Sequence, residues 1–162
     1  CALILNSISI GRSYSMTLSA AADRVIEYDR PIDIEFSIKA QEFGLKEAET
    51  MSFLSMVFSD DRAQFASVKA VSDSYPLRGD LIISDQAFER GEVIKRGPEA
   101  GELWLESRLL PSLNLISGEF LDVGIASIKV TKALIKEPDR GGGFNSTGPR
   151  VMMNMKDVKL AL

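Results

Sequence analysis

Histidine is absent from the 162 residues, and cysteine occurs once, as Cys1. Without histidine the chain has no Ser-His-Asp or Cys-His system, no HExxH zinc site and no imidazole general base. A metal site would have to use oxygen ligands alone, and no stretch resembles the calcium loop with alternating aspartates. One cysteine excludes an intramolecular disulfide without indicating a redox compartment. We therefore predict no catalytic site, no metal and no cofactor.

Basic residues do not outnumber acidic ones. Lys and Arg number 19 against 23 Asp and Glu, which gives a formal net charge of −4. The basic residues are scattered, so no stripe favours a nucleic-acid partner. No run reaches 18 consecutive apolar residues, the length that predicts a transmembrane helix. The apolar residues 1–10 leave two interpretations open, an amphipathic N-terminal helix or the end of an excised transmembrane helix.

What is present is the composition of a globular domain, with 45% hydrophobic and 26% charged residues. In the first half, apolar spacing predicts a helix over 3–20, a strand over 22–28 and a second helix over 31–45, which Gly44 ends. The period then drops to two, which predicts a hairpin of residues 49–58 and 65–71. A short strand over 81–83 completes a β-α-β-β pattern.

In the second half, leucines at near-helical spacing predict a helix over 102–115, which Pro111 kinks. Strands are expected over 119–123 and 127–135, meeting at Gly124, and over 151–155, before a final helix. The sequence thus predicts an α+β fold of two lobes, a porter-like β-α-β-β lobe and a smaller mixed α/β lobe. We expect these divisions: 1–20, an N-terminal helix or a stalk after a transmembrane helix; 21–84, the porter-like lobe; 85–101, a connector; 102–150, the second lobe; 151–162, a return strand and the start of a C-terminal helix.

Three patterns could carry chemistry. The three glycines after Arg140 free backbone N–H groups for an anion, but a phosphate loop also needs a following Lys-Ser/Thr, which is missing. A plain surface loop fits better. The alternative is a loop that contacts a partner, with Phe144 as an exposed aromatic anchor beside Arg140. Glu102 and Glu106 have the spacing of a carboxylate pair, and a solvated helix face explains that spacing too. Two Ser-x-Lys pairs, at 67–69 and 127–129, could form a serine–lysine dyad or only share a strand face.

Longer stretches resemble the periplasmic region of the YbbP-type ABC permeases, in the MacB/LolC/FtsX superfamily. The resemblance covers residues 20–155, and its most specific runs are these: Ala22-Asp23-x-Val25-Ile26-x-x-Asp29-Arg30-Pro31-Ile32; Ala48-Glu49-Thr50-x-Ser52-Phe53; Val68-Lys69-Ala70-Val71-x-x-x-Tyr75-Pro76-Leu77-Arg78-Gly79; Gly101-Glu102-x-Trp104-Leu105-x-x-Arg108-Leu109-Leu110; Glu137-Pro138-Asp139-Arg140-Gly141-Gly142-Gly143-Phe144.

The resemblance implies a FtsX-like or MacB-like periplasmic core domain in a permease of the bacterial inner membrane. Such a domain couples the motion of a separate cytoplasmic ATPase subunit to a lipid-like substrate or a periplasmic partner, in a homodimer or pseudo-dimer. It supplies no catalytic residues. Possible partner contacts lie in two loops: Tyr75, Pro76, Arg78, Asp139, Arg140, Gly142 and Phe144. Two alternatives stay open, a stand-alone module that binds a small ligand and a hydrolase that uses carboxylates or Ser/Lys.

Overall fold

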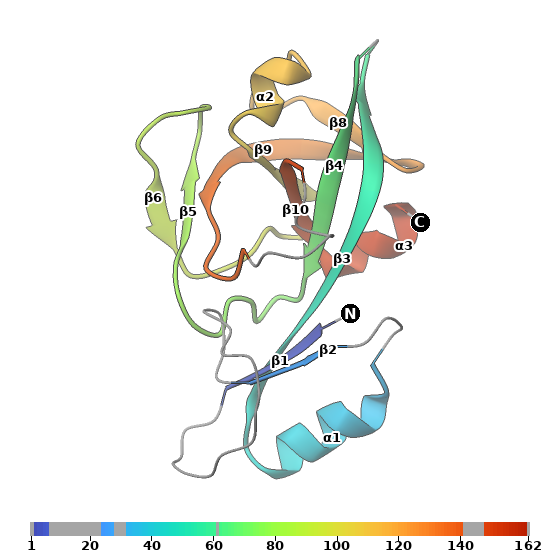
Figure 1. The fold of residues 1–162 in the computed structure, drawn as a ribbon, viewed down its shortest axis with the longest axis vertical. Coiled ribbons are helices and arrows are strands. Elements are labelled where there is room, and N and C mark those ends of the chain that lie inside the picture. Colours follow the sequence, from blue (N-terminus) through green and yellow to red (C-terminus); the bar gives the residue numbers. More distant parts are fainter. Residues whose placement is uncertain (1, 7–23, 28–31, 61, 141–147, 162) are drawn as a thin grey trace.

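A computed structural model describes residues 2–6, 24–27, 32–60, 62–140 and 148–161 (Figure 1). These residues form one continuous sheet of ten strands with a few short helices. The strands are β1 (Ala2–Asn6), β2 (Arg24–Glu27), β3 (Lys46–Ser59), β4 (Arg62–Val71), β5 (Leu81–Ser84), β6 (Glu92–Ile94), β7 (Glu102–Glu106), β8 (Phe120–Val123), β9 (Ala126–Lys136) and β10 (Arg150–Asn154). The helices are α1 (Ile34–Glu42), α2 (Leu109–Ser112), the 3-10 turn η2 (Met155–Asp157) and α3 (Val158–Ala161).

Six of the strands close into a barrel in the order β3-β4-β10-β7-β9-β8. The pairs β4–β10 and β7–β9 are parallel, and the other four are antiparallel. Strand β8 completes the ring because Val123 pairs with Val57 and Asp122 with Phe58 on β3. The expected α+β, two-lobed, porter-like fold is therefore wrong: strands dominate, and the barrel is their centre. A closed barrel leaves no edge between these strands.

The error is clearest at β7, where the leucine spacing predicted a helix. Leu103 and Leu105 point into the barrel, and Trp104 is fully buried on its outer side. A strand with both faces buried is apolar throughout, so its periodicity does not distinguish it from a helix. Only α2 remains of the helix expected over 102–115. At the other end, residues 2–6 form strand β1 instead of a helix, and residues 7–20 lie outside the described part of the chain.

Several local expectations are confirmed. Helix α1 begins after Asp33, whose carboxylate accepts a hydrogen bond from the Glu35 amide, and the chain leaves it through Gly44 at a φ of +65°. The β3–β4 hairpin has the expected antiparallel register, and Gly124 lies in the β8–β9 turn. In Figure 1, α1, β1 and β2 lie around the first part of β3, below the barrel.

Two apolar cores follow from this arrangement. The first fills the barrel, and Val68, Leu105 and Val151 are completely buried in it. The second lies on the outer side of β4, β7 and β10 under β5 and the loop around Tyr75, and it includes Trp104 and Met152. Both faces of this part of the barrel wall are therefore covered.

The barrel draws strands from both sides of the expected 85–101 connector, and that connector contains β6. The division into domains stays a prediction. Within the residues that the structure describes, no helix combines the length and hydropathy of a membrane span.

Candidate functional site

The covered outer wall of the barrel contains charged side chains. Ser67 and Lys69 alternate with apolar residues on β4, so they point out of the barrel. Arg150 on β10 pairs with Ser67 in the parallel ladder and shares its face. Lys69 and Arg150 are each about 4% exposed, although charged residues are rarely buried unless paired.

Lys69 lies among three acceptors. Its Nζ atom donates to Asp139 Oδ1 at 2.6 Å, to Tyr75 Oη at 3.1 Å and to Glu137 Oε2 at 3.3 Å. The Tyr75 hydroxyl donates in turn to Asp139 Oδ1 at 2.5 Å. Residues from β4, from the loop after it and from the segment after β9 therefore meet at one ammonium group.

Glu137 links the two buried cations, since its side chain is only 1% exposed and each oxygen has its own partner. Arg150 Nε donates to Oε1 at 2.8 Å, while Lys69 Nζ donates to Oε2. The Arg150 guanidinium also donates to Ser67 Oγ at 2.5 Å. We call Lys69, Tyr75, Glu137, Asp139 and Arg150 the buried ionic network.

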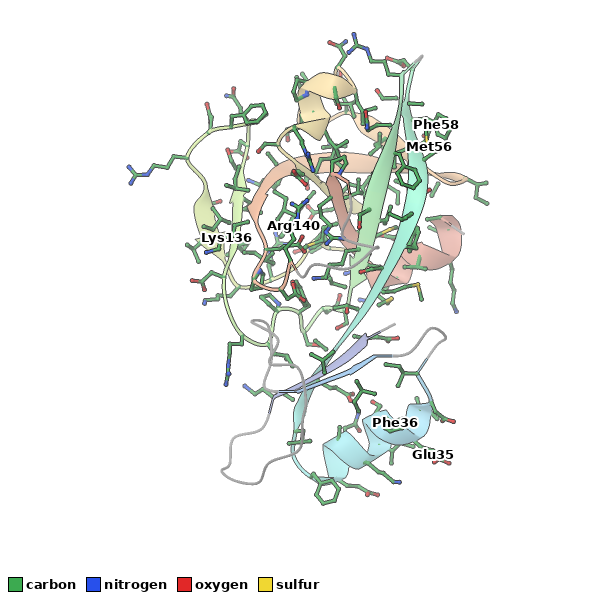
Figure 2. The ribbon with its side chains drawn as sticks, in the orientation of Figure 1. Glu35, Phe36, Met56, Phe58, Lys136 and Arg140 are labelled. Atoms are coloured by element: carbon green, nitrogen blue, oxygen red, sulfur yellow. The ribbon has the colours of Figure 1, made fainter. Side chains whose placement is uncertain are left out.

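The network continues to the surface through Glu106 at the end of β7. Its carboxylate accepts from the Arg150 amide at 2.9 Å and pairs with Arg140 at 2.8 Å and Arg108 at 2.6 Å. Arg140 also donates to the carbonyl of Gly148 at 3.2 Å. The two ends of the Gly-rich region are thereby joined to each other and to the barrel (Figure 2 labels Arg140).

Electrostatically the network is balanced, with two cations and two carboxylates. Burial and the adjacent Asp139 carboxylate raise the pKa of the Tyr75 phenol far above its ordinary value of 10.0, so the phenol is a neutral donor at working pH. Burying ion pairs has a desolvation cost that good geometry offsets only in part, but removing one partner is strongly destabilising. The network can therefore hold the loop around Tyr75 and the segment after β9 against the barrel wall. Lys69 and Arg150 are each already paired with a carboxylate of the chain itself.

This geometry also bears on the serine–lysine hypothesis. A lysine that activates a serine has to be a neutral amine in contact with the hydroxyl. Lys69 instead contacts two carboxylates, and Ser67 Oγ accepts from Arg150. Ser127 and Lys129 are both exposed. Glu102 and Glu106 lie on strand β7, so the helix face that their spacing suggested does not exist.

No family model matches the sequence. A relative does: the uncharacterized ABC transporter permease YbbP of Escherichia coli (strain K12) is 36% identical over 162 residues, which is 98% of this chain. The chain is related to the YbbP-type permeases. The resemblance expected from the sequence is thereby confirmed. The aligned region is 19% of the relative, so the chain spans about a fifth of that permease.

The loop residues singled out from the YbbP-type resemblance have unequal positions. Tyr75 is completely buried, and Asp139 lies in the same network, so these two residues pack against the outer side of the barrel wall. Pro76 is half-buried after a cis peptide bond, while Arg78 and Arg140 are exposed. Gly142 and Phe144 lie outside the described residues. A partner-contact role for any of the seven stays a prediction.

Sequence reasoning missed Lys69, Glu137 and Arg150 as a set. The sequence does contain a pattern that could have indicated two of them. Lys69 lies within the apolar run Val68 to Val71, and Arg150 precedes Val151-Met152-Met153. A charge inside an apolar strand has to be paired if both faces are covered. Among the described residues, no group of three or more His, Cys, Asp or Glu could hold a metal ion.

Proposed function

We propose that this chain is an extracytoplasmic domain of an ABC transporter permease in the bacterial inner membrane. It couples the motion of a separate cytoplasmic ATPase subunit to export or handling of a lipid-like substrate, or to a periplasmic partner. The observation that carries the proposal is the similarity to a permease over 98% of the chain. The proposal assigns the chain no reaction of its own, because a transmitting domain needs rigidity and contact surfaces.

The architecture supports a transmitting role. A closed barrel resists shear because each strand is hydrogen-bonded on both sides over part of its length. The buried ionic network then fastens the loop around Tyr75 and the segment around Asp139 to the barrel wall. A displacement applied to these loops would therefore move the barrel as one body.

The side of the membrane is testable by cysteine labelling in the full-length permease. In a cysteine-free background, Glu89→Cys places a thiol in the exposed turn between β5 and β6. We expect a membrane-impermeant maleimide to label it in intact cells whose outer membrane is permeabilised. Ser107→Cys, at a buried position, is the matched control and should react only after unfolding. Labelling of Glu89→Cys only after the inner membrane is lysed would refute the extracytoplasmic placement.

Coupling is testable by hydrogen exchange in the assembled transporter with and without trapped ATP. We expect ATP to change exchange in surface segments such as 85–95, while β4, β7 and β10 stay protected in both states. Unchanged exchange in every peptide of this chain would contradict coupling, and loss of protection across the barrel would contradict its rigidity.

The two alternatives gain less from the geometry. A hydrolase would need a neutral lysine at Ser67 or Ser127, and Lys69 contacts carboxylates while Lys129 is exposed. A ligand-binding module would need an open apolar cleft, and the barrel interior is filled by side chains such as Val57, Leu105 and Leu121.

A further inference from the structure

The buried ionic network ends at the surface in two arginines that share one carboxylate. Arg108 Nε lies 2.6 Å from Glu106 Oε1, and Arg140 Nη1 lies 2.8 Å from Glu106 Oε2. The side chains of Arg108 and Arg140 are 56% and 38% exposed, whereas that of Glu106 is 19% exposed. We call Arg108 and Arg140 the arginine pair (Figure 2 labels Arg140). One carboxylate therefore holds two guanidinium groups next to each other at the surface.

The arginine pair carries a charge that its described surroundings do not balance. The buried ionic network alone is neutral, with two cations and two carboxylates. Its extension to the surface adds both arginines but only one carboxylate. In the part of the chain that the structure describes, Glu106 is the only carboxylate in contact with either arginine. The extended cluster therefore has a surplus of one positive charge, which lies at its exposed end.

Both guanidinium groups keep N–H donors beyond those that hold them in place. A guanidinium carries N–H donors on every nitrogen. Among the described residues, the contacts of Arg108 use only Nε, and those of Arg140 use Nη1 toward Glu106 and Nη2 toward the Gly148 carbonyl. Glu106 is itself anchored, because it accepts from the Arg150 amide at 2.9 Å. An acceptor that approaches the arginine pair therefore meets donors that the chain has already positioned.

The chemistry of the arginine pair favours a phosphate group. The planar guanidinium fork donates parallel N–H bonds to two oxygens, which is why arginine is favoured for phosphate recognition. A surplus of one positive charge matches a phosphodiester, which carries a single negative charge. A phosphomonoester carries about 1.5 to 2 negative charges at neutral pH and matches less well.

We propose that the arginine pair is a binding site for a phosphodiester group, whose two non-bridging oxygens accept hydrogen bonds from Arg108 and Arg140. Glu106 is the positioning residue of this site. Phospholipid headgroups and soluble glycerophosphodiesters share this chemistry. The lipid as the source rests on the proposed handling of a lipid-like substrate, whereas the anion site itself does not depend on that function.

The test is arginine footprinting of the full-length permease in a maltoside detergent, which contains no phosphate. Phenylglyoxal modifies accessible arginines, and mass spectrometry gives the modification rate at each position. The probes are glycerophosphoglycerol, a soluble phosphodiester, and phosphatidylglycerol in the detergent micelles. Acetate has the charge without the phosphate, and diacylglycerol has the acyl chains without the headgroup, so these two are the matched compounds. Arg90, exposed in the turn between β5 and β6, is the internal control.

We expect the phosphodiester probes to slow the modification of Arg108 and Arg140 and to leave Arg90 unchanged. Arg108→Gln should raise the probe concentration that half-protects Arg140 about five-fold, because an exposed ion pair contributes up to about 1 kcal/mol. Arg108→Lys keeps the charge but loses the fork, so it should give an intermediate value. Arg90→Gln is the matched substitution and should leave the half-protecting concentration unchanged.

The two probes distinguish the sources of the phosphodiester. Protection by glycerophosphoglycerol, with or without protection by the lipid, supports a site for the phosphodiester itself, and protection by phosphatidylglycerol alone supports a lipid headgroup. Equal protection by acetate or diacylglycerol would overturn the proposal, and so would unchanged rates with both probes or an Arg108→Gln variant that behaves like Arg90→Gln. Cysteine labelling at Glu89 reports the membrane side independently, so failure here leaves the proposed function to its own test.

Discussion

Replacing Glu137 by glutamine should cost the chain about 3 kcal/mol of its free energy of unfolding. The side chain of Glu137 is 1% exposed and contacts Lys69 at 3.3 Å and Arg150 at 2.8 Å. The amide keeps the shape and one acceptor for Arg150, but it removes the charge between two buried cations and leaves Asp139 as the carboxylate in contact with Lys69. Breaking a buried pair costs about 3–5 kcal/mol, and the retained acceptor favours the lower end.

Urea unfolding measures this loss directly. With a denaturant slope of about 2 kcal/mol/M, a loss of 3 kcal/mol lowers the midpoint by about 1.5 M. The matched control is Asp85→Asn, which breaks the pair of Asp85 with Lys132 at 2.6 Å, where Asp85 is 76% exposed. An exposed pair contributes at most about 1 kcal/mol, so the control midpoint should fall by less than about 0.5 M. Equal midpoints for the two variants would refute the structural role of the network.

Two further changes test neighbouring features. Tyr75→Phe should cost about 1–3 kcal/mol in urea unfolding, because it leaves buried partners unsatisfied. The pKa of Tyr75 is raised in the folded state, so the unfolded state releases the phenol proton first as pH rises. The contribution of Tyr75 to the free energy of unfolding should therefore decline above about pH 10 in the wild type. Tyr75→Phe should lack this decline. Gly124→Ala should destabilise the fold more than Gly44→Ala in the same assay. Both glycines have φ near +60°, so the backbone strain of the substitution is similar. An added Cβ at Gly124 would lie 1.9 Å from the Ala161 carbonyl oxygen, whereas one at Gly44 meets no atom within 4 Å. Equal midpoints would refute the packing of α3 on the β8–β9 turn.

Local patterns carried the predictions that the structure confirms. The β3–β4 hairpin was predictable because its polar and apolar residues alternate and its turn residues favour a tight reversal. Helix α1 was predictable from its spacing and from Gly44 at its end. These signals involve residues close together in the chain, and a single sequence shows such local patterns directly.

Closure of the barrel could not be predicted from such local patterns. It depends on the short pairing of Val57 with Val123, and on two parallel ladders between strands distant in sequence. Leu103 and Leu105 satisfied a helical pattern because the other face of their strand is covered as well. Reading β7 as a helix removed one barrel strand, and the remaining pattern then suggested two lobes.

The buried ionic network was likewise predictable only in part. Tyr75 and Asp139 were singled out as loop residues that resemble the permease pattern, and the structure joins them through a hydrogen bond across 64 positions of sequence. Lys69 between them could not be recognised as their partner, because a lysine on a strand is by default solvated. The fold, by covering both faces of β4, turns that ordinary lysine into a charge that needs partners.

This covering also explains how the barrel wall can hold buried charges, although their desolvation has a cost. A network of buried charges contributes little net stability compared with apolar packing, but it is sensitive to position, since every contact requires hydrogen-bond geometry. Lys69 and Glu137 therefore specify where the loops sit on the barrel more strictly than apolar contacts do. By contrast, β5 and β6 are flanked by pairs such as Lys132 with Asp85, where one partner is 76% exposed. Under a force that acts on the chain, β5 and β6 should deform before the network does, which is the order that the hydrogen-exchange experiment in the assembled transporter examines.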